Sequence, residues 1–285
     1  MCAKIARQRA DQLVFMQGLA ESREQARRLI MAGKVALSSE GLPPGAPPQK
    51  VDKPGHPYPE GTVFELLGQE RFVSRGAYKL LTILDNFKLD VSGMVCLDAG
   101  ASTGGFTDCL LQHGATRVYA VDVGYGQLAW KLRSDPRVVC LERTNARYLT
   151  HEQVPDELDF ASVDVSFISL KLILPPLNGL LKDGGHAACL VKPQFEAGRE
   201  KVGKKGVVRD PAVHLEVLEH FLDHAGDAGF TVLGLTYSPI RGPEGNIEYL
   251  GYLEKGPRQE RTFDLKALVD ESHQTLKEHG EGGNP

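Results

Sequence analysis

From about residue 75 onward, short apolar runs typical of buried strands alternate with segments long enough to form helices. Strands spaced in this way are joined by helical crossovers, so the pattern predicts a parallel, doubly wound sheet. The last two runs, 230–238 and 247–255, are separated by only the eight residues PIRGPEGN. That gap is too short for a helical crossover, so the final strand is expected to be antiparallel to its neighbour. The expected strands are 94–98, 117–123, 137–142, 158–164, 186–192, 230–238 and 247–255.

The N-terminal region has a different character. Residues 1–37 hold seven Lys or Arg against three acids, although the whole chain has a net charge of −4. Two short helices are expected at 11–17 and from Ser22, which with Gln25 has the spacing of a capping box. We therefore predict a small basic α+β domain at 1–67, a linker at 68–74 and an α/β domain at 75–285. The proline-rich stretch 41–59 is expected to be a loop or extended insertion outside the core.

Several classes of protein are disfavoured. No apolar run reaches the ~18 residues of a membrane span, and the N-terminus lacks the apolar core of a secretory signal. The five cysteines include no CxxC pair and read as small buried residues of a reducing cytoplasm. His220 and His224 share a helix face but lack a third ligand, so no metal site is expected. Trp130, the single tryptophan, is expected to pack in the interior.

The segment CLDAGASTGGFTD, at 96–108, follows the first strand of the α/β domain and opens a helix. Its glycines allow a tight turn and close approach to a ligand, while the Gly-Lys-Ser/Thr of a P-loop and a GxGxxG spacing are both absent. Asp98 at the strand tip suits a cationic ligand group, and Asp122 after the second strand suits a ribose. A ligand-free turn is the alternative. The candidate ligand-binding residues are Asp98, Gly100, Ser102, Gly104, Gly105, Phe106, Asp122 and Asn145.

Four charged residues are expected to converge near this turn. Asp164 and Lys192 end two strands that should be neighbours, and chemistry in such folds lies at the carboxyl ends of strands. Lys79 lies on the helix before the first strand, and Glu248 starts the antiparallel strand. An ordinary lysine simply emerges at the surface, so the reading of Lys192 as functional depends on this convergence.

The motifs SRGAYKL, DAGASTGGFTD, VDVGYGQL, RTNAR, DVSFISL, LVKPQFE and SPIRGPEGNIEYL resemble those of the TlyA family of ribosomal RNA methyltransferases, related to the FtsJ fold. The stretch RADQLVFMQGLAESREQARRLIMAGKV resembles a small RNA-binding domain first recognised in a ribosomal protein. The resemblance implies a Rossmann-like S-adenosylmethionine methyltransferase sheet. It also implies S-adenosylmethionine as methyl donor and a cytidine 2′-hydroxyl of ribosomal RNA as acceptor. Asn145 would then contact the adenine.

The resemblance further implies roles for the four charged residues. The order Lys79, Asp164, Lys192, Glu248 matches the tetrad of ribose 2′-O-methyltransferases. Lys192 would be the proton acceptor or an orienting group, and Asp164 would position it. Lys79 would favour the neutral form of Lys192, and Glu248 would hold Lys79.

Ribosomal RNA or ribosomal subunits are the expected partner, with no membrane involved. Phosphate contacts are expected from Arg23, Arg27 and Arg28 on the second helix. The loop 198–210, which carries Lys201, Lys204 and Lys205, is expected to be a mobile lid or RNA clamp. A solvated basic face is the simpler reading of these charges.

Three other functions compete with that of a methyltransferase. A non-catalytic RNA-binding module is disfavoured by the four intact charged residues. A pseudouridine synthase can carry the same small domain but has no use for a cofactor site. Membrane lysis, suggested by the haemolysin name of some family members, finds no spanning or strongly amphipathic lytic segment in this chain.

Overall fold

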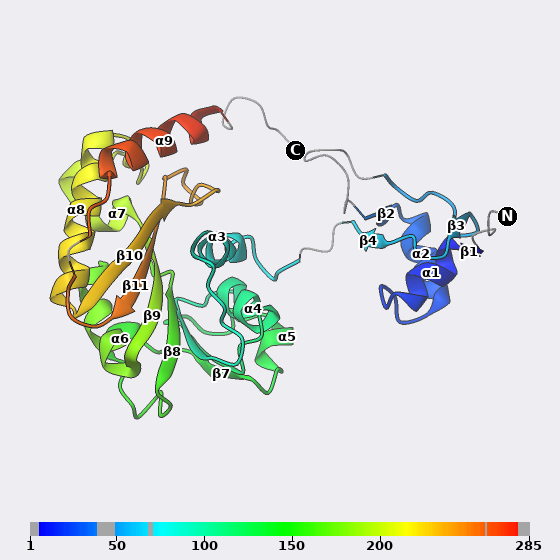
Figure 1. Cartoon of the computed structure of the whole chain (residues 1–285), viewed down its shortest axis with the longest axis horizontal. Helices are drawn as coiled ribbons and strands as arrows, with labels where there is room; N and C mark the ends of the chain where they lie inside the picture. The colour runs from blue at the N-terminus through cyan, green and yellow to red at the C-terminus, as the bar shows by residue number, and fades with distance from the viewer. Residues whose placement is uncertain (1–5, 39–48, 68–70, 260, 279–285) are drawn as a thin grey trace. The chain divides into compact units, whose positions relative to one another are not determined.

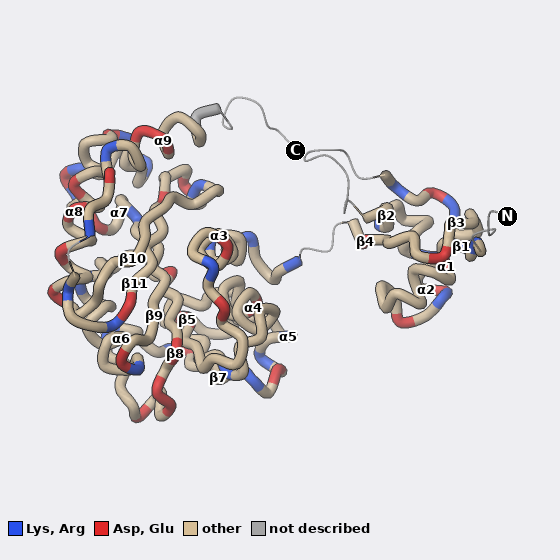
Figure 2. The backbone as a smooth tube through the Cα atoms, in the orientation of Figure 1, with Lys and Arg blue, Asp and Glu red and all other residues tan. Residues whose placement is uncertain are grey.

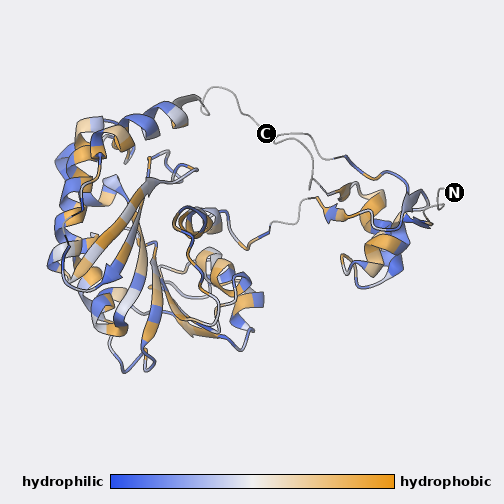
Figure 3. Ribbon diagram, in the orientation of Figure 1, coloured by the Kyte–Doolittle hydropathy of each residue, from blue (hydrophilic) through white to orange (hydrophobic). Residues whose placement is uncertain are grey.

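The computed structural model describes residues 6–38, 49–67, 71–259 and 261–278, and the chain divides into two compact units, Met1–Arg71 and Phe72–Pro285 (Figure 1). Each unit has its own apolar core, and Figure 3 shows hydrophobic residues, in orange, along the helices and strands of both units. None of the helices formed by the described residues is both long enough and apolar enough to cross a bilayer.

The small unit combines two helices with two pairs of short antiparallel strands. Its elements are β1 (Arg7–Arg9), α1 (Ala10–Met16), α2 (Arg23–Met31), β2 (Val35–Leu37), β3 (Pro57–Pro59) and β4 (Phe64–Leu66), with β1 paired to β3 and β2 to β4. The Ser22 hydroxyl caps α2 by accepting the N–H of Gln25, as the capping-box spacing predicts. Val14, Ala26, Ile30 and Phe64 pack in the core.

The expectation for the proline-rich stretch was wrong in its second half. Residues 41–48 lie outside the described residues, but Val51 is fully buried and donates its N–H to the Val35 carbonyl. Pro57–Pro59 forms β3, and short edge strands tolerate proline where no ladder hydrogen bond is donated. Residues 49–59 are therefore part of the small unit, with Val51 in its apolar core.

The large unit is built on a seven-stranded sheet with the order β10-β11-β9-β8-β5-β6-β7. The strands β5 to β9 are parallel, whereas β11 is antiparallel to both β9 and β10. The predicted α/β class and the antiparallel final strand are confirmed, and β11 lies inside the sheet rather than at its edge. The strands are β5 (Val95–Ala99), β6 (Arg117–Val121), β7 (Val138–Leu141), β8 (Leu158–Val163), β9 (Leu181–Val191), β10 (Phe230–Tyr237) and β11 (Tyr249–Lys255).

Helices cover both faces of this sheet (Figure 1). One layer contains α3 (Ala77–Phe87), α4 (Gly105–Gln112) and α5 (Trp130–Arg133), whose Leu80, Ile83 and Leu110 are fully buried. The other contains α6 (Leu174–Leu180), α8 (Pro211–Asp227) and α9 (Leu265–Glu278). The short helices η1 (Ala146–Tyr148), η2 (Leu170–Leu172), α7 (Pro193–Glu196) and η3 (Arg199–Lys201) lie in the connections.

Two local expectations differ from the structure. Of the expected linker 68–74, residues 68–70 lie outside the described residues, while Phe72 is buried against α3 and α4 and the Val73 N–H bonds to Asp108. The large unit therefore begins at Phe72 rather than at residue 75. Trp130 is 78% exposed and not part of either core, because it starts the four-residue helix α5 at the surface.

Candidate active site

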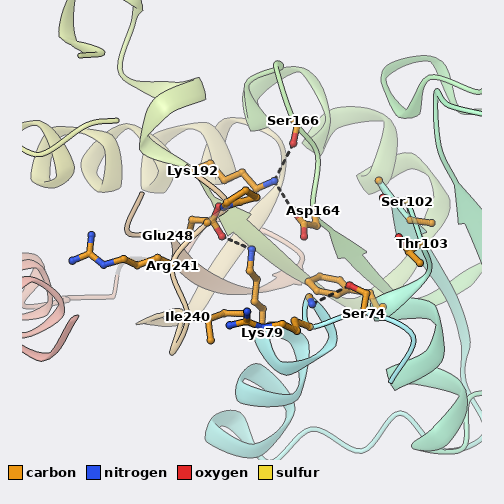
Figure 4. Close-up of a pocket in the computed structure, with 18 of the residues that line it drawn as sticks. Ser74, Lys79, Ser102, Thr103, Asp164, Ser166, Lys192, Ile240, Arg241 and Glu248 are labelled. Carbon is orange, nitrogen blue, oxygen red and sulfur yellow. Dashed lines mark hydrogen bonds and ion pairs between the residues drawn. The ribbon is translucent and has the colours of Figure 1, made fainter. Parts of the chain in front are cut away.

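A cavity of about 710 Å³ lies at the carboxyl ends of β5, β8 and β9 (Figure 4). Its walls come from five places in the chain: α3, the turn after β5, the ends of β8 and β9, and the loop between β10 and β11. All four charged residues expected to converge, Lys79, Asp164, Lys192 and Glu248, line it. The volume is that of an ordinary small-molecule site.

Lys79 and Glu248 form one ion pair of this cavity. Lys79 Nζ lies 2.5 Å from Glu248 Oε2, and the two side chains are only 8% and 1% exposed. Gly242, in the β10–β11 loop, covers Glu248 so closely that an added Cβ would lie 2.5 Å from Glu248 Oε1. The two residues are 169 positions apart, and the contact exists because α3 meets the start of β11.

Lys192 and Asp164 form the second pair. They end the adjacent parallel strands β9 and β8, and Lys192 Nζ lies 2.5 Å from Asp164 Oδ1. The same amine donates to the Val165 carbonyl at 3.0 Å and the Ser166 hydroxyl at 3.2 Å. The amine therefore has one close carboxylate and two hydrogen-bond acceptors, while Asp164 Oδ1 accepts no hydrogen bond from a described residue. A lysine can therefore follow the buried strand β9, because the segment after β8 supplies a carboxylate and two hydrogen-bond acceptors for its amine.

The glycine turn passes directly under the second pair. Gly100 has φ +90°, and a Cβ there would lie 2.3 Å from the Asp164 carbonyl oxygen, so only glycine fits. Asp98, fully buried, accepts the N–H and the hydroxyl of Thr107 on one carboxylate oxygen, Oδ2. Its Oδ1 has no hydrogen-bond partner among the described residues.

Burial raises the pKa of Asp98 to about 7. The hydrogen bonds from Thr107 oppose this shift, and the negative charges of Asp164 and Asp122 add to it. A cationic ligand group beside Oδ1 would favour the ionised carboxylate.

The remaining expected ligand residues divide into two groups. Ser102, Gly105 and Phe106 line the main cavity, and Asp122 lines a small neighbouring hollow that shares Ser102 with it. Asp122 accepts the N–H groups of Ser102 and Gly124 at 2.8 and 2.7 Å, which fixes its carboxylate.

Gly104 and Asn145 do not line the main cavity. Gly104 instead precedes α4 as its N-cap, with φ +98°, and a Cβ there would collide with Leu128 and Leu132. Asn145 is exposed, and its side chain caps η1 by accepting the N–H of Arg147. The expected contact of Asn145 with the adenine therefore has no direct support in the position of its side chain.

These residues fit S-adenosylmethionine. The donor set offers an unpaired buried carboxylate oxygen at Asp98, a fixed carboxylate at Asp122 and a turn at Gly100 that admits close approach. A cationic methionine moiety and a ribose are the groups that such carboxylates accept.

The expected RNA contacts differ in their availability. Arg23, Arg27 and Arg28 are exposed on α2, and Figure 2 shows the blue Lys and Arg positions of the small unit. Lys204 and Lys205 are exposed in a turn whose base, Val207 and Val208, is buried. Two of the expected contacts are already paired: Lys201 with Glu216 at 2.5 Å and Arg23 with Asp11 at 3.4 Å.

Sequence reasoning missed two residues beside the catalytic candidates. Gln194, two positions after Lys192, lines the cavity. Asn246, 1% exposed, accepts the Val208 N–H and donates to the Gly206 carbonyl, which ties the turn of Lys204 and Lys205 to the start of β11. Both lie within quoted motifs, LVKPQFE and SPIRGPEGNIEYL, and their proximity to Lys192 and Glu248 was the available signal.

Comparison with known proteins assigns both units. Residues 72–255 match the FtsJ-like methyltransferase family, and residues 8–37 match the S4 domain. The cofactor of this enzyme class is S-adenosylmethionine, in agreement with the donor set at Asp98 and Asp122. The FtsJ-like match begins at Phe72, where the large unit begins.

Similar proteins extend over nearly the whole chain. The 16S/23S rRNA (cytidine-2′-O)-methyltransferase TlyA of Mycobacterium tuberculosis is 44% identical over 274 residues, covering 95% of this chain and 98% of that protein. Hemolysin A of Brachyspira hyodysenteriae is 41% identical over 86% of this chain and 98% of its own length. A solved structure of a hemolysin-named protein from Streptococcus thermophilus has 47% identity and a TM-score of 0.73, covering 98% of this chain and 100% of that one. The chain therefore belongs to the TlyA family, with an S4 domain followed by an FtsJ-like methyltransferase domain.

Proposed function

We propose that this protein transfers the methyl group of S-adenosylmethionine to the ribose 2′-hydroxyl of a cytidine in ribosomal RNA. The observation that carries the proposal is the meeting of two lysine–carboxylate pairs at one cavity beside the glycine turn of a TlyA-family chain. The named activity of the Mycobacterium tuberculosis relative supports the acceptor. The ribosomal subunit in the cytoplasm is proposed as the assembly that presents this cytidine.

Lys192 is proposed as the proton acceptor. When bound, S-adenosylmethionine supplies an electrophilic methyl group, and a sugar hydroxyl becomes a competent nucleophile as its proton is removed. In the described structure Lys192 Nζ lies beside Asp164 and donates hydrogen bonds to the Val165 carbonyl and the Ser166 hydroxyl. It must therefore lose a proton, and one of these contacts, before it can receive the proton of the 2′-hydroxyl. Asp164 then keeps the amine directed at the acceptor oxygen.

The other pair is proposed to set the electrostatic potential. Lys79, held by the buried Glu248, places a second lysine–carboxylate pair at the same cavity. The compensation of Lys79 by Glu248 keeps this second charge tolerable in a buried place.

RNA capture is proposed to use the exposed cations of both units. Arg23, Arg27 and Arg28 on the S4 domain, and Lys204 and Lys205 on the large unit, would neutralise phosphates. Lys201, paired with Glu216, would contribute less.

The test is tritiated methyl transfer to purified small and large ribosomal subunits from a strain that lacks this protein, followed by mapping of the labelled nucleotide. We expect label on a cytidine ribose, with Lys192→Ala inactive and Lys171→Ala, an exposed control on η2, fully active. Label on a base nitrogen or carbon, or no label on either subunit, would contradict the proposal.

A further inference from the structure

The segment Lys192–Glu196 follows β9 and forms one wall of the cavity. Glu196 fastens α7 to η2, because its carboxylate accepts the Ser169 hydroxyl at 2.6 Å and the Leu170 N–H at 2.8 Å. Phe195 packs with its ring centroid 5.0 Å from that of Phe167. Pro193 is buried at the first position of α7. These neighbours fix the position of the segment, whereas no hydrogen bond of the Gln194 side chain to another described residue contributes to it.

Gln194 lines the cavity together with Lys192 and Asp164, yet its side-chain oxygen is unsatisfied. Oε1 of Gln194 is buried and has no hydrogen-bond partner among the described residues. A buried acceptor left unpaired is destabilising, so such an atom in a site is expected to meet a donor on the ligand. Gln194 is therefore a candidate contact to whatever occupies this side of the cavity.

The topology indicates which ligand that is. The residues that fit the cofactor lie after β5 and β6, whereas Gln194 follows β9, which is separated from β5 by β8. The cationic methionine moiety of the cofactor would also face the carboxylate of Asp98, and its ribose that of Asp122, rather than a neutral amide. Gln194 is thus on the side of the acceptor nucleoside, near the lysine proposed to receive the 2′-hydroxyl proton.

In a nucleoside the base is attached to the carbon next to the one that bears the 2′-hydroxyl. A ribose held at Lys192 therefore brings its base beside the same wall. Cytosine and uracil differ at position 4, where cytosine carries an amino donor and uracil a carbonyl acceptor. A fixed acceptor oxygen distinguishes the two bases at this position, because it accepts a hydrogen bond from the amino group of cytosine and is repelled by the carbonyl oxygen of uracil.

We infer that Gln194 is a specificity-determining residue whose Oε1 accepts a hydrogen bond from the 4-amino group of the target cytosine. The inference rests on the proposed function, since it requires a ribose acceptor at Lys192. It adds to that function a reason why cytidine, rather than uridine, is methylated.

The test compares ribosomal subunits that carry cytidine or uridine at the mapped target position, with Gln194→Ala, Gln194→Glu and the exposed control Gln153→Ala. We expect the unmodified chain to prefer cytidine by roughly 100-fold in kcat/KM, the upper range of discrimination that a good hydrogen-bonding contact to a base edge provides. In Gln194→Ala the preference should fall to less than about tenfold, mainly through slower reaction with cytidine. Gln194→Glu, whose carboxylate accepts but cannot donate, should keep the preference.

A target nucleoside with hydrogen at position 4 completes the cycle. The unmodified chain should methylate this nucleoside as slowly as Gln194→Ala methylates cytidine. Gln194→Ala acting on this nucleoside should show no further loss of kcat/KM, because both changes remove the same hydrogen bond. Calorimetry with S-adenosylhomocysteine and thermal melting should give values for the Gln194 variants within twofold and a few degrees of the unmodified chain.

Failure of this inference can be distinguished from failure of the proposed function. An unchanged cytidine-to-uridine ratio in Gln194→Ala would overturn this inference alone, as would a large loss of S-adenosylhomocysteine affinity, which would place Gln194 in the cofactor site. If the unmodified chain methylated neither kind of subunit, the proposed function would fail and the inference with it.

Discussion

The two lysine–carboxylate pairs of the cavity have the same chemistry but different surroundings. In the Lys79–Glu248 pair both side chains are nearly sealed, at 8% and 1% exposed. In the Lys192–Asp164 pair the carboxylate is 21% exposed, and the amine has two further acceptors. The two lysines are almost equally buried, at 8% and 9% exposed, so the difference lies in the carboxylates: Asp164 is open to a ligand, whereas Glu248 is covered.

The largest expected effect separates the pairs by catalysis. Lys192→Ala should lower kcat by about 10³-fold, the usual contribution of a positioned acid–base group, and leave S-adenosylhomocysteine affinity within a few-fold. Methyl-transfer kinetics and calorimetry measure the two quantities. Near-normal turnover in this variant would remove Lys192 from the mechanism, and Lys171→Ala serves as the exposed control.

The next effect separates the pairs by stability. Glu248→Gln leaves the buried Lys79 without its counter-charge and should lower the free energy of unfolding by about 3 kcal/mol. Asp164→Asn should cost about 1 kcal/mol, because Lys192 keeps two acceptors and the site is partly open. Urea unfolding at pH 7 measures both. Equal losses would mean that the two pairs do not differ in the way their burial suggests.

Asp98 provides a test by pH. With a pKa of about 7 in the folded protein, Asp98 becomes ionised as the pH rises from 6 to 8. Binding of the cationic S-adenosylmethionine should therefore tighten about tenfold over this interval. In Asp98→Asn the dependence should vanish. A binding constant in the unmodified chain that does not change between pH 6 and 8 would contradict the assignment.

The pKa of Asp98 depends on the Lys192–Asp164 pair, through the charge of Asp164. The charge of Asp164 contributes to the raised pKa of Asp98, so Asp164→Asn should move the change in affinity to lower pH, and Glu248→Gln should not.

The stability of the unliganded protein should follow the opposite trend with pH. The folded pKa of Asp98 is raised from 3.8, so its contribution is fully present below about pH 4 and is lost as the pH rises through 7. Asp98→Asn should flatten this part of the curve in urea unfolding.

The smallest effect repeats the contrast between open and compensated lysines on the protein surface. Lys204 and Lys205 form no ion pair with a described residue, whereas Lys201 is paired with Glu216. If RNA phosphates bind at this turn, Lys204→Ala and Lys205→Ala should each reduce the slope of log affinity against log salt by about 0.7–0.9. Lys201→Ala should reduce it less. Equal slopes for all three would argue against a phosphate contact at the turn.

Local patterns in the sequence were sufficient for the class of the large unit. The alternation of apolar runs with helix-length segments predicts the parallel strands, and the short gap before Glu248 predicts an antiparallel β11. Because chemistry gathers at the carboxyl ends of adjacent strands, Asp164 and Lys192 could be paired before any coordinates. These inferences succeed because strand period and crossover length are local properties.

Contacts between distant segments could not be read in the same way. Val51 lies in a proline-rich stretch with the composition of a loop, and only packing against β2 shows that it is core. Lys201 resembles Lys204 and Lys205 in the sequence, but Glu216 on α8 neutralises it. Trp130 is an apolar residue that the sequence favours as interior, and the short α5 leaves it exposed.

By itself, then, the sequence determined which charged side chains this protein has and which strands they follow. Both can be read from the sequence because strand and helix patterns are local properties of the chain. Only the tertiary structure decided how each group is buried and satisfied: that Glu248 is sealed, that Asp164 is open, and that Gln194 keeps an unpaired oxygen. Burial and hydrogen bonding depend on segments up to 169 residues away in the chain, and a spacing pattern contains no record of them.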